Sequence, residues 1–296
     1  MYNPSLPEFL HTDLDAIDFL EITSDMFWTD HGSGSTPRYE EVELWVDLLD
    51  WIAERRPIVA HNIGLSIGNA GSFDLGYVKH IASWHQRYHF PWHSDHLLFA
   101  DVTDLDGQTH NSGVGLPLPC DNEVLDMIVK RVKQVHEIVP VPFILENGAY
   151  FVVFPEQEMS ETQFLNALTA RAGCGLLLDL HNLYANARNH GFDALQFLHE
   201  LDLTRVVETH IAGGTEFAGM YTDSHSGPCP EPVWQLLEHV VPMAPNLRAV
   251  TFEFHDSYYA FLGPRGVRAE LERARNIFTR LSEARLGATG ISTRVV

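Results

Sequence analysis

The amino-acid sequence predicts a parallel α/β fold and favours a (β/α)8 barrel over an open, doubly wound sheet. Short apolar runs alternate with longer amphipathic runs along the chain, as expected for repeated strand–helix units. The chain has 296 residues, which suits one barrel because such domains typically need about 250 residues. No G-x-G-x-x-G turn follows the first predicted strand, and this weakens the case for a dinucleotide-binding sheet.

Seven strands are predicted from the short apolar runs. They are Ile17–Ile22, Ile58–His61, Phe90–Leu97, Phe143–Glu146, Gly175–Asp179, Val206–Ile211 and Ala249–Phe254. An eighth would be Met1–Asn3, cut short by the start of the sequence. The prediction is therefore a (β/α)8 TIM barrel whose first strand is short or missing.

Helices are predicted between these strands. The helical runs are Tyr39–Arg55, Asn122–Val139, Ser160–Ala172, Pro232–Val241 and Val267–Leu281. Ser160 and Gln163 have the spacing of a capping box, and Gly173 is placed to end that helix. The sequence contains no linker-like or repetitive tract. We expect a single catalytic domain over residues 1–280 and a C-terminal tail over 281–296.

Composition excludes several classes of protein. The formal net charge is −21, and so acidic a surface repels phosphate backbones and anionic lipids, which argues against a nucleic-acid partner. Three cysteines without a C-x-x-C argue against a disulfide framework and a thiolate zinc site. The first fifteen residues lack the features of a signal peptide, and no apolar run approaches the length of a membrane span. We therefore expect a cytoplasmic protein with no membrane segment.

Metal-capable side chains stand where the predicted strands end. Six consecutive strands carry, at or next to their last residue, His61, His96, Glu146, Asp179, His210 and Glu253. Catalytic groups of a barrel come from the carboxyl ends of its strands, so these side chains are expected to converge. Asn182 follows Asp179, and the loop after His210 adds Asp223 and His225.

A metal is the expected partner of these carboxylates. Burying an uncompensated charge is costly, so a carboxylate at the end of a buried strand must be paired or neutralised. No lysine or arginine stands beside the carboxylates in these segments. Imidazole and carboxylate together suit iron, manganese or zinc.

Each of these residues, taken singly, has an ordinary structural explanation. His61 could be a buried structural histidine, Glu146 could cap the turn that follows it, and Asp179 could cap the next helix. Asp223 and His225 would ordinarily be turn residues. These single explanations do not account for six consecutive predicted strands that all end in a side chain able to bind a metal. That regularity favours a metal site. Either an orienting role or a place on the polar rim suits four further residues, His93, His181, His255 and Asp256.

At this level of detail the sequence resembles a known family, the multinuclear non-heme iron-dependent oxidative enzymes. The matching segments span most of the chain in the family order. They are HNIGLSIG (61–68), SDHLLF (94–99), LPLP (116–119), LENGAYF (145–151), LLLDLHNLYANARNHGFDA (176–194), ETHIAGG (208–214), DSHSGPCPEPVW (223–234) and FEFHD (252–256).

The resemblance implies a xylose isomerase-like barrel and a specific activity. Studied members modify cysteine residues of ribosomally made precursor peptides, with dioxygen and two or three irons, and a separate partner protein often presents the peptide. The resemblance maps metal-ligand roles onto nine residues, of which the six at strand ends are also the expected catalytic residues. The nine are His61, His96, Glu146, Asp179, Asn182, His210, Asp223, His225 and Glu253.

By resemblance and strand order, the ligands are expected to divide into three groups. His61, His96 and Glu146 would hold one iron; Asp179, His210 and Glu253 would hold a second, with Glu146 bridging the pair; and Asn182, Asp223 and His225 would hold a third. Two departures from the family are visible. The glycine-containing first strand is reduced to Met1–Asn3 or lost, and the first of two usual asparagines after the aspartate is His181.

Two other functions compete with this one. A zinc- or manganese-dependent TIM-barrel hydrolase or isomerase, acting on a sugar or a phosphoester, would use similar ligand types, and fold alone cannot decide between them. A metal-binding or peptide-binding partner protein with a degenerate site is the third alternative. The full complement of ligand types argues against it.

Overall fold

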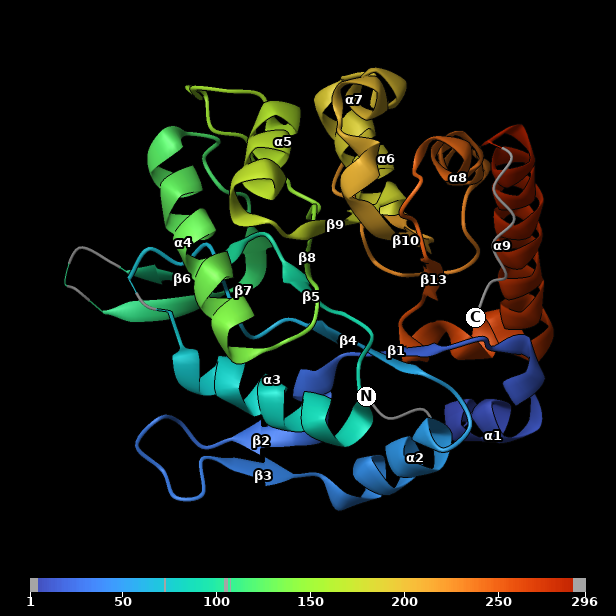
Figure 1. The fold of residues 1–296 in the computed structure, drawn as a ribbon, viewed down its shortest axis with the longest axis horizontal. Helices are drawn as coiled ribbons and strands as arrows, with labels where there is room; N and C mark the ends of the chain where they lie inside the picture. The colour runs from blue at the N-terminus through green and yellow to red at the C-terminus, as the bar shows by residue number, and fades with distance from the viewer. Residues whose placement is uncertain (1–4, 72, 104–105, 107, 290–296) are drawn as a thin grey trace. The chain divides into compact units, whose positions relative to one another are not determined.

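The computed structural model describes residues 5–71, 73–103, 106 and 108–289 (Figure 1). It divides into two compact units, which we describe separately: residues 17–175, and residues 176–296 together with the first sixteen residues. Both units are built from parallel strands followed by helices. The eighth strand expected at Met1–Asn3 falls outside the described residues.

The unit of residues 17–175 contains four parallel strands in the order β1-β4-β5-β8. Their bounds are β1 Leu20–Ile22, β4 Ile58–Asn62, β5 His93–His96 and β8 Phe143–Glu146. The helices of this unit are α2 Glu43–Ala53, α3 Leu75–Tyr88, α4 Asn122–Ile138 and α5 Glu161–Ala172, with a short 3-10 turn, η2, at Ser24–Phe27. Strands β4 and β8 are buried throughout, so their side chains form the centre of this unit.

Two antiparallel hairpins extend the loops of the same unit. One pairs β2 (Trp28–Asp30) with β3 (Tyr39–Glu41), and the other pairs β6 (Phe99–Thr103) with β7 (Thr109–Leu116). The predicted helix Tyr39–Arg55 was wrong at its start, because Tyr39–Glu41 pairs with β2 and the helix begins only at Glu43. Strand pairing outside the local sequence overrides helix propensity in this segment.

The second unit contains three parallel strands in the order β9-β10-β13. Their bounds are β9 Gly175–Asp179, β10 Val206–Ala212 and β13 Ala249–Glu253. Gly175, the first residue of β9, is the last residue of the other unit. The helices are α1 Ser5–Thr12, α6 Leu180–His190, α7 Ala194–Glu200, α8 Glu231–Met243 and α9 Tyr259–Thr289, with 3-10 turns at Leu14–Ala16 (η1), Leu203–Arg205 (η3) and Asp256–Tyr258 (η4). A hairpin of β11 (Thr215–Phe217) and β12 (Met220–Thr222) follows β10.

Local sequence signals set the ends of several helices. Ser160 and Gln163 form the predicted capping box of α5, and Gly173 ends the helix in the left-handed region at φ 76°. Asp179 caps α6 by accepting a hydrogen bond from the backbone N–H of Asn182. Helix α9 contains the predicted run Val267–Leu281 and is kinked at Gly263, whose φ of 62° and ψ of 171° are not helical.

The apolar runs located the strands well, but their bounds differ in places. Strands β8 and β9 have the predicted bounds, whereas β1 starts at Leu20 and not at Ile17, and β5 covers only His93–His96. Helices α1, α3, α6 and α7 are absent from the predicted helical runs, although a helix after Asp179 was considered as a structural alternative for that residue. No helix among the described residues is both long and apolar enough to cross a membrane.

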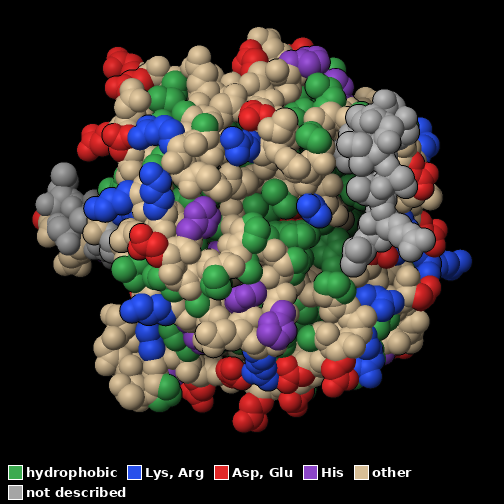
Figure 2. Space-filling view, in the orientation of Figure 1, with side chains coloured by type: hydrophobic (Ala, Val, Ile, Leu, Met, Phe, Trp, Pro, Cys, Tyr) green, Lys and Arg blue, Asp and Glu red, His purple; other side chains and the backbone are tan. Residues whose placement is uncertain are grey.

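Charged side chains of both signs are interspersed on the face of the molecule in Figure 2. Several cations of the described surface are paired: Arg87 contacts Glu41 and Asp50, and Arg171 contacts Asp126. Each exposed pair of this kind contributes at most about 1 kcal/mol to stability. The fold therefore depends mainly on its buried apolar residues, such as Val59, Ile144 and Leu177, all of them fully buried.

Candidate metal centre

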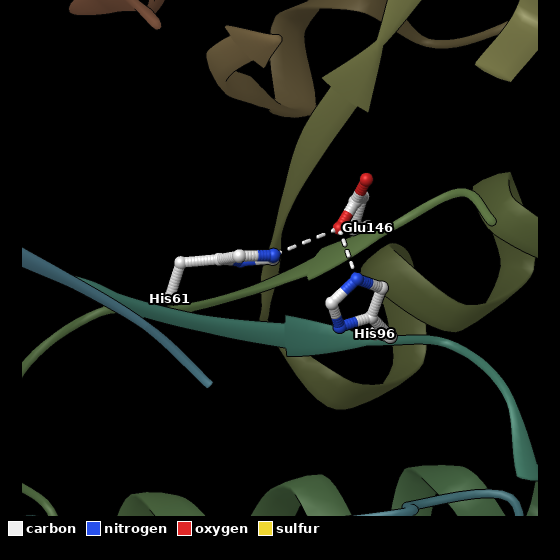
Figure 3. Close-up of side chains that lie close together, drawn as sticks. All are labelled: His61, His96 and Glu146. Atoms are coloured by element: carbon white, nitrogen blue, oxygen red, sulfur yellow. Dashed lines mark ion pairs between the residues drawn. The ribbon is translucent and has the colours of Figure 1, made fainter. Parts of the chain in front are cut away.

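Three side chains converge at the carboxyl ends of β4, β5 and β8. His61 Nε2 and His96 Nε2 each lie 3.2 Å from the same carboxylate oxygen, Oε2 of Glu146 (Figure 3). The ring centroids of the two histidines are 4.6 Å apart. Parallel pairing explains the convergence, since His96 is in register with Glu146, and His61 is in register with Ser94 on the strand between them.

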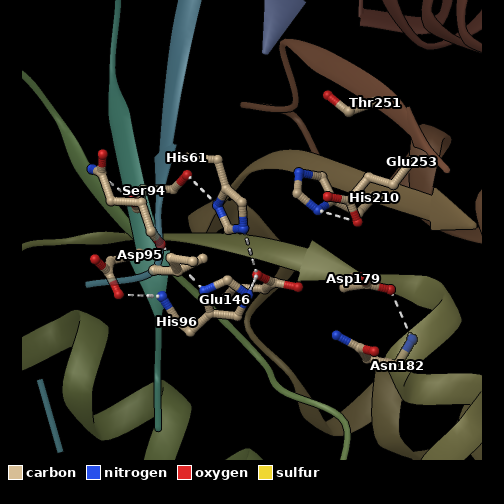
Figure 4. A network of polar contacts seen from close by, with 12 residues as sticks. His61, Ser94, Asp95, His96, Glu146, Asp179, Asn182, His210, Thr251 and Glu253 are labelled. Atoms are coloured by element: carbon tan, nitrogen blue, oxygen red, sulfur yellow. Dashed lines mark hydrogen bonds and ion pairs between the residues drawn. The ribbon is translucent and has the colours of Figure 1, made fainter. Parts of the chain in front are cut away.

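The other nitrogen of each imidazole is held by the protein. His61 Nδ1 lies 2.8 Å from Ser94 Oγ, and this hydroxyl donates to the carbonyl oxygen of Ala60 at 3.3 Å (Figure 4). His96 Nδ1 lies 3.2 Å from the carbonyl oxygen of Asn62. A carbonyl can only accept, and the Ser94 hydroxyl already donates, so both Nδ1 atoms carry the proton.

The neutral forms of these histidines therefore direct the lone pair of each Nε2 toward Glu146. Two lone pairs and a carboxylate oxygen that face one another repel unless a cation lies among them. A histidine that donates from its second nitrogen to a hydroxyl or carbonyl is the usual arrangement around protein-bound metals. His61 and Glu146 are 4% and 2% exposed, so water cannot fully screen the charge. The donor chemistry of this cluster fits a divalent metal.

The unit that contains β9, β10 and β13 holds a second set of donors. His210 Nδ1 lies 3.0 Å from Oε2 of Glu253, the last residue of β13 (Figure 4). Asp179, the last residue of β9, is in register with His210. The Asp179 and His210 side chains are fully buried, and Glu253 is largely so. The three residues predicted as the second ligand group thus lie on adjacent strands.

The loop after β12 adds to this second set. His225 Nε2 lies 3.0 Å from Oδ1 of Asp223 and 3.6 Å from Oε2 of Glu253. His225 adopts a φ of 47°, which is unusual for a residue other than glycine and marks a backbone held in place by its surroundings. The expected second and third ligand groups are therefore joined through the contact of His225 with Glu253.

The electrostatics of this loop favour a positive charge. Burial alone would raise the pKa of Asp223, but hydrogen bonds from His181 and His225 outweigh burial and hold that pKa well below its usual range. Burial disfavours a charged His225, yet Glu253 and Asp223 together raise its pKa to about 10. A proton on His225 thus balances the carboxylates here, and a divalent cation bound by the same atoms would do so equally.

His181 holds Asp223 in place. Its Nδ1 lies 2.9 Å from Asp223 Oδ1, and its Nε2 lies 3.3 Å from the hydroxyl of Tyr221. Both ring nitrogens are therefore engaged by the protein. Of the two roles left open by the sequence, this geometry supports the orienting one.

Several positioning residues were missed by the sequence analysis. Asn189 on α6 exchanges two hydrogen bonds of 2.8 Å with the backbone of Tyr221, two residues before Asp223. Ser94 orients His61, and Asp95 accepts the backbone N–H groups of Leu65 and His96. Only strand register reveals that Ser94 faces His61, so no local pattern could have identified it.

The remaining candidate residues make other contacts. His93 is buried against the ring of Phe143, with 4.7 Å between ring centroids. His255 is 55% exposed and accepts from the backbone of Ser257 as the cap of η4, with Asp256 beside it. Asn182 lies in the first turn of α6, where its N–H is bonded to Asp179. The metal-ligand roles of the nine predicted residues stay a prediction.

The fold and the donor sets define a xylose isomerase-like TIM barrel, as two solved structures illustrate. One is the IOLI protein, described with a bound zinc atom: the TM-score is 0.57 at 15% identity, over 96% of this chain and 94% of that one. The other is endonuclease IV from Thermus thermophilus: the TM-score is 0.54 at 14% identity, over 94% and 93%. At these identities the likeness shows the fold alone, and it confirms the predicted fold class.

The chain belongs to the family of RiPP precursor modification enzymes MbnB/TglH/ChrH, whose model matches residues 2–279. RiPPs are ribosomally synthesised and post-translationally modified peptides. Two relatives named "UPF0276 protein" are similar over most of their length. The one from Caulobacter vibrioides is 32% identical over 235 residues (79% of this chain, 78% of that protein), and the one from Shewanella sediminis is 35% identical over 233 residues (78% and 77%). Family membership confirms the resemblance noted in the sequence, and it makes the protein a precursor-modifying enzyme.

Proposed function

We propose that this enzyme is a multinuclear non-heme iron protein that uses dioxygen to modify cysteine residues of a ribosomally synthesised precursor peptide. The main support for this proposal is that His61 Nε2 and His96 Nε2 each lie 3.2 Å from the same carboxylate oxygen of Glu146. Imidazole and carboxylate donors of this kind suit iron. Family membership supports the peptide substrate.

The proposed ligands are the nine residues expected from the sequence. His61, His96 and Glu146 form the first group, whose donor atoms lie within 4.8 Å of one another. Asp179, His210 and Glu253 form the second group, and Asn182, Asp223 and His225 form the third. Bridging of two irons by Glu146 stays a prediction.

Bound iron would supply Lewis acidity and redox chemistry with dioxygen, and a site for the thiolate of the substrate cysteine. The protein's own contribution is to hold the donors in place. Ser94 and the carbonyl of Asn62 keep both Nδ1 atoms protonated, so that Nε2 is the available donor. His181 performs the same orienting task for the carboxylate of Asp223.

A zinc- or manganese-dependent hydrolase or isomerase acting on a sugar or phosphoester is the alternative, because the same donors also suit those metals. The two functions differ in their requirement for oxygen. A hydrolase or isomerase would work with zinc under anaerobic conditions, whereas the proposed enzyme needs iron and dioxygen.

The proposed oxidative function also includes a separate partner protein that presents the precursor peptide to the enzyme.

The test begins with protein purified without oxygen from iron-rich medium. We expect at least about two irons per chain by elemental analysis, with Mössbauer spectroscopy to identify ferrous and ferric sites. A short cysteine-bearing peptide encoded beside the gene is the substrate to test. We expect a mass change that requires oxygen and is abolished when its cysteine is replaced by serine, since a hydroxyl is a poorer soft ligand. Activity with zinc alone would favour the alternative, and an unchanged reaction of the serine peptide would exclude a thiolate mechanism.

A further inference from the structure

A pocket of about 190 Å³ lies in the unit of residues 17–175, directly beyond the first donor group. Its lining includes Leu97 and Leu98, which follow His96, and Asn147 and Gly148, which follow Glu146. The backbone N–H of Leu97 donates to the carbonyl oxygen of Glu146 at 3.0 Å, so the two lining segments lie side by side where they leave the donor group. A group held in this pocket would stand close to the candidate metal.

The walls of the pocket are apolar and closely packed. Leu98 and Leu118 line it, and each packs closely against a glycine. A Cβ atom added at Gly115 would lie 2.3 Å from a methyl carbon of Leu98, and one at Gly68 would lie 2.7 Å from the Leu98 carbonyl oxygen. A side chain at either glycine would clash with this wall, so the close packing around Leu98 requires glycine at both positions.

The lining residues include one carboxylate. Glu161, the first residue of α5, lines the pocket, and one of its oxygens accepts a hydrogen bond of 3.2 Å from the hydroxyl of Tyr150. Burial raises the pKa of Glu161 to about 7, and the hydrogen bond from Tyr150 offsets only part of that rise. No lysine or arginine is among the lining residues that the structure describes. The carboxylate thus lacks a cationic neighbour within the pocket.

Three consecutive apolar residues beside the pocket are exposed. Phe151, Val152 and Val153 follow one another in the loop between β8 and α5, and they are 41%, 54% and 56% exposed. Val152 and Val153 belong to the pocket lining. Contiguous exposed apolar side chains beside a pocket are typical of a surface that binds another molecule.

We propose that this pocket binds the side chain of a lysine or arginine of the precursor peptide, close to the residue that is modified. The proposal rests on the proposed function, because it takes the substrate to be a peptide. A lysine or arginine has a long apolar stem that suits the leucine walls and a cationic head that suits Glu161. A wholly apolar side chain would leave the carboxylate desolvated without compensation, and an acidic one would be repelled.

The test uses n-butylammonium, which has the chemistry of a lysine side chain, and butan-1-ol as its uncharged counterpart. Binding is followed through the methyl NMR signals of 13C-labelled leucine, in protein without added metal or peptide. We expect n-butylammonium to shift the signals of Leu98 and Leu118, which line the pocket, and to bind at least about tenfold more tightly than butan-1-ol. Oxidative activity is not needed, so a failure here is distinguishable from a failure of the proposed function.

Glu161→Gln tests the carboxylate with almost no change of shape. We expect it to weaken n-butylammonium binding about tenfold and to leave butan-1-ol binding unchanged. Glu158→Gln is the matched control, because Glu158 is an exposed acid of the same loop that contacts Asn122 and does not line the pocket. Circular dichroism checks folding of both variants. Equal binding of the two probes to the wild type, or equal binding of n-butylammonium to wild type and Glu161→Gln, would overturn the proposal.

Discussion

His61 and Glu146 meet at 3.2 Å between Nε2 and Oε2, although β5 lies between the strands that carry them. His96, on β5 itself, approaches the same oxygen from below that contact in Figure 3. Side chains two strands apart meet most readily where a sheet curves and its inward side chains point toward a common centre. The register of β4, β5 and β8 brings the three donors together, and neighbouring groups then fix the orientation of each donor.

The first prediction concerns the orientation of His61. Ser94→Ala removes the oxygen that lies 2.8 Å from His61 Nδ1, and it leaves a buried N–H without its partner. Loss of such an orienting partner typically lowers metal affinity by about 10–100-fold. Anaerobic titration with ferrous iron, followed by spectroscopy, measures the change.

Ser83→Ala is the matched control for this variant, because Ser83 is exposed on α3 and only bonds the carbonyl oxygen of His80. We expect it to bind iron like the wild type. If Ser94→Ala also gave the wild-type titration curve, the hydroxyl would have no orienting role.

The second prediction concerns His181, whose two ring nitrogens contact Asp223 and Tyr221. His181→Leu removes the donor at 2.9 Å from Asp223 and leaves a partly buried carboxylate less stabilised. We expect about 10–100-fold weaker iron binding at the group that includes Asp223 and His225. Metal analysis and Mössbauer spectroscopy would show the loss.

His181→Asn is the rescue variant, since the amide nitrogen of asparagine can occupy nearly the place of Nδ1. It should retain most of the iron that His181→Leu loses. Tyr221→Phe removes only the partner of Nε2, at 3.3 Å, and should have the smaller effect. An iron content unaffected by His181→Leu would mean that Asp223 needs no support from this side chain.

The local sequence was sufficient to locate the ends of these strands, but it did not predict all of the segments between the strands. The apolar runs ending in Glu146 and Asp179 have the predicted bounds, because each strand is a buried apolar run that ends in an acidic residue. The pairing of Tyr39–Glu41 with β2 depends on residues nine and more positions away, which is why that segment was predicted as helix.

The sequence likewise shows which residue types could donate to a metal, but not how their side chains contact one another. The sequence indicates that His61 and Glu146 end strands, yet it does not contain the register that brings Ser94 to His61. The contact of His225 with Glu253 depends on an unusual backbone conformation, at a φ of 47°, in a loop whose composition is ordinary. Long-range geometry of this kind is set by packing and not by periodicity.

The third prediction concerns acid stability and His93. This side chain is 3% exposed, and neither of its ring nitrogens has a hydrogen-bond partner among the described residues. Burial, together with His136 on α4 and His85 on α3, lowers the pKa of His93 from 6.5 to about 3. The unfolded chain therefore binds this proton more readily, and the free energy of unfolding falls as the pH drops from about 6.5 toward about 3.

The loss due to His93 should reach about 2 kcal/mol by pH 5. His93→Phe keeps a ring stacked on Phe143 and removes the titrating group, so its stability should depend less on pH in this range. Urea unfolding at pH 7 and pH 5 measures the difference. His199→Phe, at an exposed position, should retain the wild-type dependence, and parallel curves for His93→Phe and the wild type would contradict the assignment.

The last prediction concerns how the proposed ligands divide. The first two groups contain three carboxylates at strand ends, Glu146, Asp179 and Glu253, whereas Asp223 is the only carboxylate of the third group and lies on a loop. Attraction for a divalent ion increases with ligand charge, and ordering a loop costs entropy. The third group should therefore bind iron most weakly. We expect Asp223→Ala to lose about one iron per chain, and Glu146→Ala to disturb about two if it bridges.

Metal counting on both variants tests this division, with circular dichroism to check folding. The matched controls are Asp47→Ala and Glu43→Ala, two exposed acids of α2 that should leave the iron content unchanged. The 3.6 Å contact between His225 and Glu253 offers the specific route by which the prediction can fail. If a metal at the third group is needed to position Glu253, then Asp223→Ala will release as much iron as Glu146→Ala. Equal losses would show that the groups fill cooperatively, and the division proposed from strand order would be wrong.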